Sequence, residues 1–419
     1  MVAHQNRPLM EDVVQRCCGL DVHQRSITAC IMRQGYPRQI RTFDTTTRAL
    51  IELRDWLTEE RITHLAMEST GVYWKPVYNI LDPHFTLLLV NARHIKHVPG
   101  RKTDVLDAEW ICRLLRAGLL RGSFIPDQPV RRLRDLTRYR KKLQGELRSE
   151  KNRVHKLLQD SNVKLTSVLT DIFGKTGRQI LDELRKGPIE AGELSQLFRR
   201  YHQLKASPEQ AAEALQGHFT DHHRFLLGQM LDRVDFTLQR IDQLEAEVDR
   251  LTADHFKTQL ELLQTIPGVQ LLGATTILAE VGANMQFFPT AEQLTSWCGL
   301  CPGQKESAGV RASGRTRKGN THLKTMLVEC AWCAVRTQDT YLRAKYYKIL
   351  PRLGKRKAMV VIAHKLLIAV YYVIRDGVPY RELTPQYLDQ NCQDRMIAYH
   401  LKQLHKLGVE QINTPLAIS

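Results

Sequence analysis

The sequence of 419 residues has no uninterrupted apolar run of about 18 residues, the length that a membrane-spanning helix needs. Its first residues, MVAHQNRPLMEDVV, lack the basic and then apolar pattern of a secretory signal. Nine cysteines in a long chain without such a signal are typical of reduced thiols in a cytosol. We therefore expect a cytoplasmic protein without a membrane partner.

Acidic residues are in short supply, because 44 Asp and Glu stand against 61 Lys and Arg, for a formal net charge of +17. Such an excess favours a polyanionic partner, most simply a nucleic acid. A generally basic, solvated surface is the alternative, but the charge is clustered. Residues 131–158 hold eleven Lys or Arg and three acids in one strongly helical pattern, which favours contact with nucleic acid.

The first 125 residues predict an α/β domain with a mixed sheet. Three strand-like segments, CCGLDVH, SITACIMR and RQIRTFD, are followed by a helix that Thr46 or Thr47 would cap. THLAMES then predicts a fourth strand, VYWKPVYNIL a short helix, FTLLLVNA a fifth strand, and a further helix begins near Thr103. Three antiparallel strands followed by alternating helices and strands is the order of elements in RNase H-like folds.

Composition divides the rest of the chain into a basic helix and coiled-coil region (126–260), a mainly α C-terminal domain (261–385) and a tail (386–419). Within residues 225–251, apolar residues recur at spacings of four and three, which fits a coiled coil or a long helical hairpin. Two explanations of this pattern stay open: the apolar residues pack against the basic helix of the same chain, or they contact a second subunit. TIPGVQLLGATTILAEVG predicts a helix, a Pro-Gly turn and another helix, a form whose backbone N–H groups often meet a phosphate.

Four carboxylates have placements that suggest a metal site. Asp21 interrupts an apolar strand, Glu68 ends the fourth strand, and Asp104 and Asp107 share one face of the following helix. Each acid also has an ordinary interpretation. Asp21 could be a buried acid whose hydrogen bonds the backbone satisfies, and Glu68 could cap the next helix. Asp104 could be an N-cap, and Asp107 could be a surface acid. The RNase H-like order would bring all four together, and hard oxygen ligands suit Mg²⁺ or Mn²⁺. Two such ions can promote phosphodiester chemistry.

Two C-x-x-C pairs form a rival metal motif. Cys298 and Cys301 make the first pair, and Cys330 and Cys333 make the second. The gap between the pairs exceeds the usual spacing of a zinc ribbon, and the second pair lies in an apolar helical stretch. Buried thiols are therefore favoured over structural zinc.

Several motifs in order resemble the insertion-sequence-110 (and 1111) transposase family. In the first part they are GLDVH, MESTGVYW and GRKTDVLDA. In the second part they are IPGVQLLGATTILAEVG, FFPTAEQLTSWCGLCPGQKESAG and SGRTRKGNTHLKTML. The resemblance covers residues 17–120 and 260–385, and the middle helical part matches in character only.

This resemblance implies a RuvC-like DEDD catalytic domain whose acids are Asp21, Glu68, Asp104 and Asp107, and a nucleophilic serine in the C-terminal domain. Ser307 follows an acid as in the family, although this chain reads E-S-A-G where the family has E-S-G, and Ser313 competes with it. A serine attacking a phosphodiester conserves the bond energy in a phosphoserine link. The implied activity is that of a DNA transposase or recombinase. A RuvC-like nuclease or junction resolvase that uses water, and a non-catalytic nucleic-acid scaffold, are the alternatives.

The resemblance also implies partners: donor and target DNA, a noncoding guide RNA encoded by the element, and further copies of the chain in a dimer or tetramer. It implies a bacterial cytoplasm near the nucleoid. Base pairing would read sequence in such a scheme while the protein reads shape. Basic residues expected to contact phosphates, rather than only form a solvated basic face, are Arg101, Lys102, Arg131, Arg132, Arg138, Arg140, Lys141, Lys142, Arg311, Arg315, Arg317, Lys318 and Lys324.

Overall fold

The computed structural model describes residues 13–69, 71–91, 107–187, 213–303, 305–307, 310–313 and 316–383, with Ser207, Gln210, Ile397, Leu401 and His405. The chain divides into two compact units, Met1–Ile125 and Pro126–Ser419. The predicted division into four domains stays a prediction, and most of the predicted tail lies outside the described residues.

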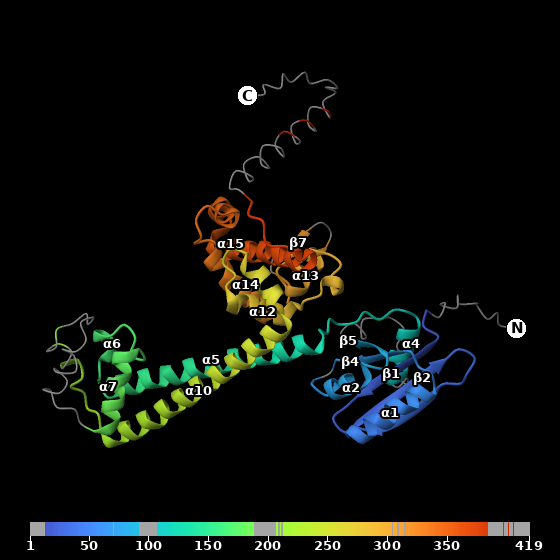
Figure 1. Ribbon diagram of the computed structural model, residues 1–419, viewed down its shortest axis with the longest axis horizontal. Coiled ribbons are helices and arrows are strands. Elements are labelled where there is room, and N and C mark those ends of the chain that lie inside the picture. Colours follow the sequence, from blue (N-terminus) through green and yellow to red (C-terminus); the bar gives the residue numbers. More distant parts are fainter. Residues whose placement is uncertain are drawn as a thin grey trace. The chain divides into compact units, whose positions relative to one another are not determined.

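Unit 1 contains a five-stranded mixed sheet with the order β3-β2-β1-β4-β5 (Figure 1). β1 pairs antiparallel with β2, which pairs antiparallel with β3, whereas β1–β4 and β4–β5 are parallel. This arrangement confirms the predicted α/β, RNase H-like class. The strands are β1 (Arg16–Val22), β2 (Ser26–Arg33), β3 (Gln39–Asp44), β4 (His64–Glu68) and β5 (Thr86–Val90).

Helices cover both faces of this sheet. α1 (Thr47–Glu59) and α2 (Trp74–Leu81) share one apolar cluster with Leu20 and Leu65, and α4 (Asp107–Arg116) shares another with Cys17 and Ala66. Thr46 caps α1 as predicted, because its hydroxyl accepts a hydrogen bond from the Ala49 N–H. The alternation along β1 thus turns its odd-numbered residues toward α4.

Close approach of α4 to β1 requires a glycine at position 19. A Cβ built on Gly19 would lie 2.2 Å from the carbonyl oxygen of Ala108 and 2.5 Å from the nitrogen of Cys112. These neighbours are backbone atoms, which cannot rotate aside. Gly19 therefore brings the first turn of α4 onto the strand that carries Asp21.

We expect Gly19→Ala to lower the free energy of unfolding by about 3 kcal/mol or more, because overpacking against backbone forces α4 off the sheet. Gly145→Ala is the matched control, since a Cβ at this exposed helical position meets nothing within 4 Å. That control should stabilise the chain by about 0.5–1 kcal/mol. Chemical denaturation monitored by circular dichroism measures both, and equal effects of the two changes would contradict this packing.

In unit 2, two long helices pack along one another (Figure 1). They are α5 (Gln128–Asp160), the predicted basic helix, and α10 (Asp221–His255), which contains the apolar repeat of residues 225–251. Leu227, Leu231 and Val234 of the repeat are buried, whereas Leu238 is 39% exposed. The intrachain alternative therefore accounts for the repeat, and a subunit contact stays a prediction. Two shorter helices, α6 (Leu165–Val168) and α7 (Lys175–Lys186), complete a small core with these long helices.

The rest of unit 2 is mainly helical, as predicted. α11 (Lys257–Gln264) and α12 (Leu271–Val281) flank the Pro-Gly turn, and η1 (Met285–Phe287) and α13 (Ala291–Cys298) follow. A two-stranded hairpin, β6 (Lys305–Ser307) and β7 (Val310–Ser313), precedes α14 (Thr321–Ala334) and α15 (Tyr341–Asp376). This hairpin, hereafter the serine hairpin, contains both candidate serines.

α15 is long and apolar enough to cross a membrane by length and composition alone. Its most apolar 18-residue window has a mean hydropathy of 1.8, and half of that window is buried inside the protein. The helix is also broken at Gly354, where φ is +71°. A buried core helix meets the same criterion, so the predicted absence of a membrane partner stays a prediction.

Candidate active site

Two acids lie side by side at the ends of neighbouring parallel strands. The register pairs Leu20 of β1 with Met67 of β4, so Asp21 and Glu68 are the next residues along each strand. Both follow the alternation that turns Gly19 and Ala66 toward α4. The carboxyl ends of parallel strands are where α/β proteins commonly place ligand groups.

Asp107 joins this pair from the first turn of α4. The contact between Gly19 and Ala108 places the start of α4 against β1, two residues before Asp21. The pKa of Asp21 indicates the same proximity. Burial raises the pKa of Asp21 most, and the negative charges of Asp107 and Glu68 raise it further, against a lowering influence of His23. Two of the other predicted acids, Glu68 and Asp107, therefore lie within electrostatic reach of Asp21.

The fourth acid, Asp104, lies outside the described residues, as do Arg101 and Lys102. Within the part of the chain that the structure describes, no three His, Cys, Asp or Glu side chains are already arranged as a metal-ligand set. The donor chemistry nevertheless fits a hard divalent cation, because clustered carboxylates raise the pKa of one another and a cation would relieve that repulsion. Asp21, Glu68 and Asp107 could hold Mg²⁺ or Mn²⁺ together with Asp104.

His23 is a neighbour that the sequence reasoning missed. Its Nε2 lies 3.1 Å from Oδ2 of Asp21, and its side chain is 66% exposed. The signal was present in the GLDVH motif, because residues two apart on a strand face the same side. His23 therefore belongs to the rim of the acidic cluster.

Glu109 was also missed, and it holds the start of α4 in place. Its side chain is 4% exposed and forms ion pairs with Arg38 and with Nη2 of Arg113, the latter at 2.6 Å. Arg38 immediately precedes β3, so this carboxylate links α4 to the antiparallel edge of the sheet. No local pattern could reveal this link, because Arg38 and Glu109 are 71 residues apart in sequence.

The two candidate serines occupy opposite ends of the serine hairpin. Ser307 is the last residue of β6 and pairs with Val310, next to the turn. Ser313 ends β7 and pairs with Lys305, at the end where the hairpin joins the rest of unit 2. Arg311 lies in β7, whereas Arg315 lies outside the described residues. Ser307 is thus at the end of the paired strands away from the Pro302–Thr316 bridge.

The predicted phosphate-contacting residues of α5 have different environments. Arg132 and Lys142 are exposed, and Arg131 and Lys141 are partly buried. Arg140 forms an ion pair with Glu245 of α10. Arg138 donates to both carboxylate oxygens of Glu280, and Lys324 donates to Gly299 and Thr316. Beyond the hairpin, Arg317 and Lys318 are exposed.

We expect Arg132→Ala and Lys142→Ala each to weaken DNA binding and to make its salt dependence shallower by about one unit of slope in log Kd against log salt. Each change removes one exposed cation that can displace a condensed counterion. Arg48→Ala, in α1, is the control, since Arg48 is 91% exposed but lies outside the basic helix. Fluorescence anisotropy across a salt series measures the slopes, and unchanged slopes in both α5 variants would contradict the assignment.

The two C-x-x-C pairs do not behave alike. Cys298 and Cys330 are buried, and burial raises the pKa of each thiol to about 12. Cys301 is partly buried and Cys333 is exposed. Burial of one thiol in each pair agrees with the thiol interpretation, and whether the pairs bind zinc stays a prediction.

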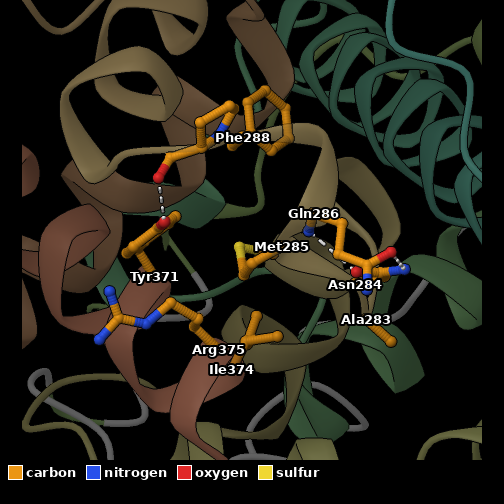
Figure 2. A pocket seen from close by; sticks show the side chains of 9 residues that line it. Ala283, Asn284, Met285, Gln286, Phe288, Tyr371, Ile374 and Arg375 are labelled. Carbon is orange, nitrogen blue, oxygen red and sulfur yellow. Dashed lines mark hydrogen bonds between the residues drawn. The ribbon is translucent and has the colours of Figure 1, made fainter.

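A surface pocket of about 550 Å³ lies between η1 and the C-terminal part of α15 (Figure 2). Asn284, Met285 and Gln286 line one side and Tyr371 and Arg375 another, and the Tyr371 hydroxyl donates to the carbonyl oxygen of Pro289 at 3.0 Å. Among the described residues that line this pocket, none is a site residue predicted from the sequence.

Comparison with known proteins matches both parts of the chain. A model of IS110-type DEDD transposases, described as a transposase, matches residues 18–163, and a model of the IS116/IS110/IS902 transposase family matches residues 260–348. The protein named "Putative transposase y4qE" of Sinorhizobium fredii (strain NBRC 101917 / NGR234) is 29% identical over 275 residues, 64% of this chain and 55% of that protein.

Two further relatives agree. "Putative transposase y4rJ" of the same strain is 25% identical over 302 residues, 66% of this chain and 67% of that protein. The "Insertion element IS900 uncharacterized 42 kDa protein" of Mycobacterium paratuberculosis is 25% identical over 221 residues, 50% of this chain and 53% of that protein. The matches thus span about half to two thirds of these relatives.

The residues that a model of DEDD transposases matches contain the RNase H-like sheet and its three neighbouring acids, which places this part of the chain in that class. The chain belongs to the IS110 family of transposases.

Proposed function

We propose that this chain is the transposase of an insertion sequence and that it cuts and rejoins DNA strands with divalent metal and a serine nucleophile. The observation that carries the proposal is the electrostatic influence of Glu68 and Asp107 on Asp21, three acids that come from separate elements of unit 1. Their negative charges add to burial in raising the pKa of Asp21, which disfavours its charged form unless a cation is present. Family membership supplies DNA as the substrate class.

In the proposed reaction the hydroxyl of Ser307 attacks a phosphodiester of DNA. The Oγ–P bond forms as the P–O3′ bond breaks, the serine loses its proton, and the departing 3′-oxygen gains one. The phosphoserine ester keeps the energy of the broken bond, so a second DNA 3′-hydroxyl can reverse the step and join strands. Bound Mg²⁺ or Mn²⁺ supplies charge stabilisation for the attacking and leaving oxygens.

The chain's own residues have separable tasks in this scheme. Asp21, Glu68, Asp104 and Asp107 would hold the cation, and Glu109 fixes the start of the helix that contributes Asp107. Ser307 lies at the end of the paired strands opposite the base formed by Pro302 and Thr316, and this position supports it over Ser313 as the nucleophile.

The same proposal includes the partners that the resemblance implies. A formal charge of +17 supports the binding of donor and target DNA together with a guide RNA. Further copies of the chain would form a dimer or tetramer. Because the substrate is DNA and the relatives are bacterial, we place the protein in the bacterial cytoplasm near the nucleoid.

A RuvC-like nuclease that uses water is the second candidate, because the acids alone could support hydrolysis. A trapping experiment separates the two. Protein purified together with its guide RNA is incubated with DNA carrying the element's ends and Mg²⁺, and the mixture is denatured with detergent and separated by electrophoresis. A slowly migrating DNA band that protease digestion converts to free DNA is a covalent adduct and supports the transposase. Free cleaved strands without such a band support the nuclease.

A further inference from the structure

A buried carboxylate in unit 2 has no role in the scheme so far. Glu280 lies in the last turn of α12, and its side chain is 1% exposed. Arg138 of α5 donates from Nε to Oε1 at 2.8 Å and from Nη2 to Oε2 at 2.7 Å. Burial alone would raise the pKa of Glu280, but these donors together with Asn320 outweigh it and hold the pKa below its ordinary value. Glu280 is therefore an ionised, fully enclosed anchor.

Arg134 strengthens the same anchor from α5. Its Nε donates to the carbonyl oxygen of Ala279 at 2.9 Å, and its Nη2 donates to that of Glu280 at 2.8 Å. These carbonyls belong to the last turn of α12, where helices leave acceptors without intrahelical partners. The end of α12 is consequently fixed to the basic helix by side-chain and backbone acceptors together.

Asn320 connects the anchor to α14. Its Nδ2 donates to Oε2 of Glu280 at 2.6 Å, while its Oδ1 accepts from the Leu323 N–H at 3.1 Å and caps the helix. One side chain thus uses both ends of its amide, which fixes its orientation. The first turn of α14 is held by the buried carboxylate.

Lys324, one turn along α14, holds both ends of the serine hairpin. Its Nζ donates to the carbonyl oxygen of Gly299, before the hairpin, at 3.0 Å, and to Oγ1 of Thr316, after it, at 2.7 Å. Thr316 also forms a bridge with Pro302 across the base. The two ends of the hairpin are therefore joined to each other and to α14.

Backbone packing tightens the same junction. A Cβ on Gly319 would lie 2.4 Å from both the nitrogen of Gly299 and the carbonyl carbon of Cys298. Gly299 itself has φ of +78°, a left-handed conformation that favours glycine. The segments that enter and leave the hairpin thus touch directly, which leaves little freedom at its base.

We propose that Glu280, Asn320 and Lys324 form a bracket that sets the position of the serine hairpin, and that they are positioning residues for strand cleavage. This inference rests on the proposed function, because it assumes that Ser307 of the hairpin is the nucleophile. It also gives Lys324 a different task from phosphate contact, since its ammonium group already binds the hairpin base. Small displacements of a nucleophile cost about 100-fold in rate, so a rigid base has a catalytic purpose.

Two variants test the bracket. Asn320→Ser keeps a good N-cap but cannot reach Glu280, and Lys324→Met keeps the apolar stem but loses both donated bonds. Tyr371→Phe is the matched control, because it removes one hydrogen bond of 3.0 Å to Pro289 in the same unit, away from the hairpin base. All three are compared with wild type at saturating DNA for the rate of adduct formation, and separately for Kd and its salt slope.

We expect both bracket variants to form adduct about 10- to 100-fold more slowly, with Kd and salt slope unchanged and the control like wild type. Amide hydrogen exchange of residues 305–313 should be faster in both variants, which tests the bracket even if one variant is less stable than wild type. An unchanged rate and exchange, or a weaker Kd with a shallower salt slope in Lys324→Met, would overturn the inference.

Failure of the bracket and failure of the proposed function give different results. If wild type forms no adduct, or Ser307→Ala forms as much as wild type, the proposed nucleophile is wrong. The exchange rates of the hairpin then still decide whether the bracket restrains it. If the adduct depends on Ser307 while the bracket variants react at the wild-type rate, only the bracket is wrong.

Discussion

Asp21→Asn is expected to give a protein that is more stable than wild type without metal, yet cleaves DNA more than about 100-fold more slowly. Burial and the charges of Asp107 and Glu68 raise the pKa of Asp21, so the folded state disfavours its ionised form. Asparagine removes that unfavourable charge at nearly constant shape. Loss of a residue that only hydrogen-bonds a metal ligand already lowers metal affinity or activity by up to about 100-fold, and loss of a ligand itself should lower activity more.

The sign of the pH effect follows from the raised pKa. Between the ordinary value of 3.8 and the higher folded-state pKa, the folded protein binds more protons at Asp21 than the unfolded chain does. The contribution of Asp21 to stability therefore falls as pH rises through this window, and the penalty persists above it. Asp21→Asn should remove this fall, which thermal melts in EDTA between about pH 4 and pH 8 would show.

Divalent metal supplies the complementary test of the same residue. Mg²⁺ should raise the Tm of wild type, because it binds only the folded cluster, and should raise that of Asp21→Asn much less. Asp55→Asn is the control, since Asp55 is an exposed acid of the same unit that accepts hydrogen bonds from Arg54. A lower Tm for Asp21→Asn without metal, together with an undiminished Mg²⁺ effect, would contradict the cluster.

Ser307→Ala is expected to abolish the covalent protein–DNA adduct while DNA affinity stays within about twofold of wild type. Removing a nucleophile removes the chemical step, and losses of about 10⁶-fold are known for such changes. Ser313→Ala is the control, because Ser313 lies at the opposite end of the same hairpin. Detergent-resistant adducts from radiolabelled DNA, with affinity measured by anisotropy, provide both readouts.

The two serine variants also separate the alternatives. Adduct lost only in Ser313→Ala would make Ser313 the nucleophile. Cleaved strands without an adduct in every variant would favour the water-using nuclease. Strand transfer that persists in Asp21→Asn would mean that these acids have no catalytic part.

Much of the α/β unit was predictable because its signals are local. An apolar run with one embedded acid marked β1, alternating residues marked β2, and Thr46 or Thr47 marked the start of α1 as its cap. Asp21 attracted attention because an acid inside a buried strand is costly. Its proximity to Glu68 followed from the order of elements, since adjacent parallel strands bring their ends together.

Residues that act through distant partners were not predictable. Arg138 and Glu280 are 142 positions apart, so the basic pattern of α5 suggested phosphate contact and gave no sign of an internal ion pair. Lys324 raised the same expectation, because the charge of a lysine is visible in a sequence and its acceptors are not. His23 differs from these, since its two-residue spacing from Asp21 was readable from the strand alternation.

The most direct measurement is anomalous X-ray diffraction from crystals of the full chain soaked with Mn²⁺. We expect an anomalous peak about 2.0–2.4 Å from carboxylate oxygens of Asp21, Glu68 and Asp107, the range of oxygen–cation distances for such ions. The peak should be absent from crystals of Asp21→Asn. Saturating Mn²⁺ that leaves these carboxylates without a peak, or that binds only elsewhere, would contradict the claim that they form the metal site.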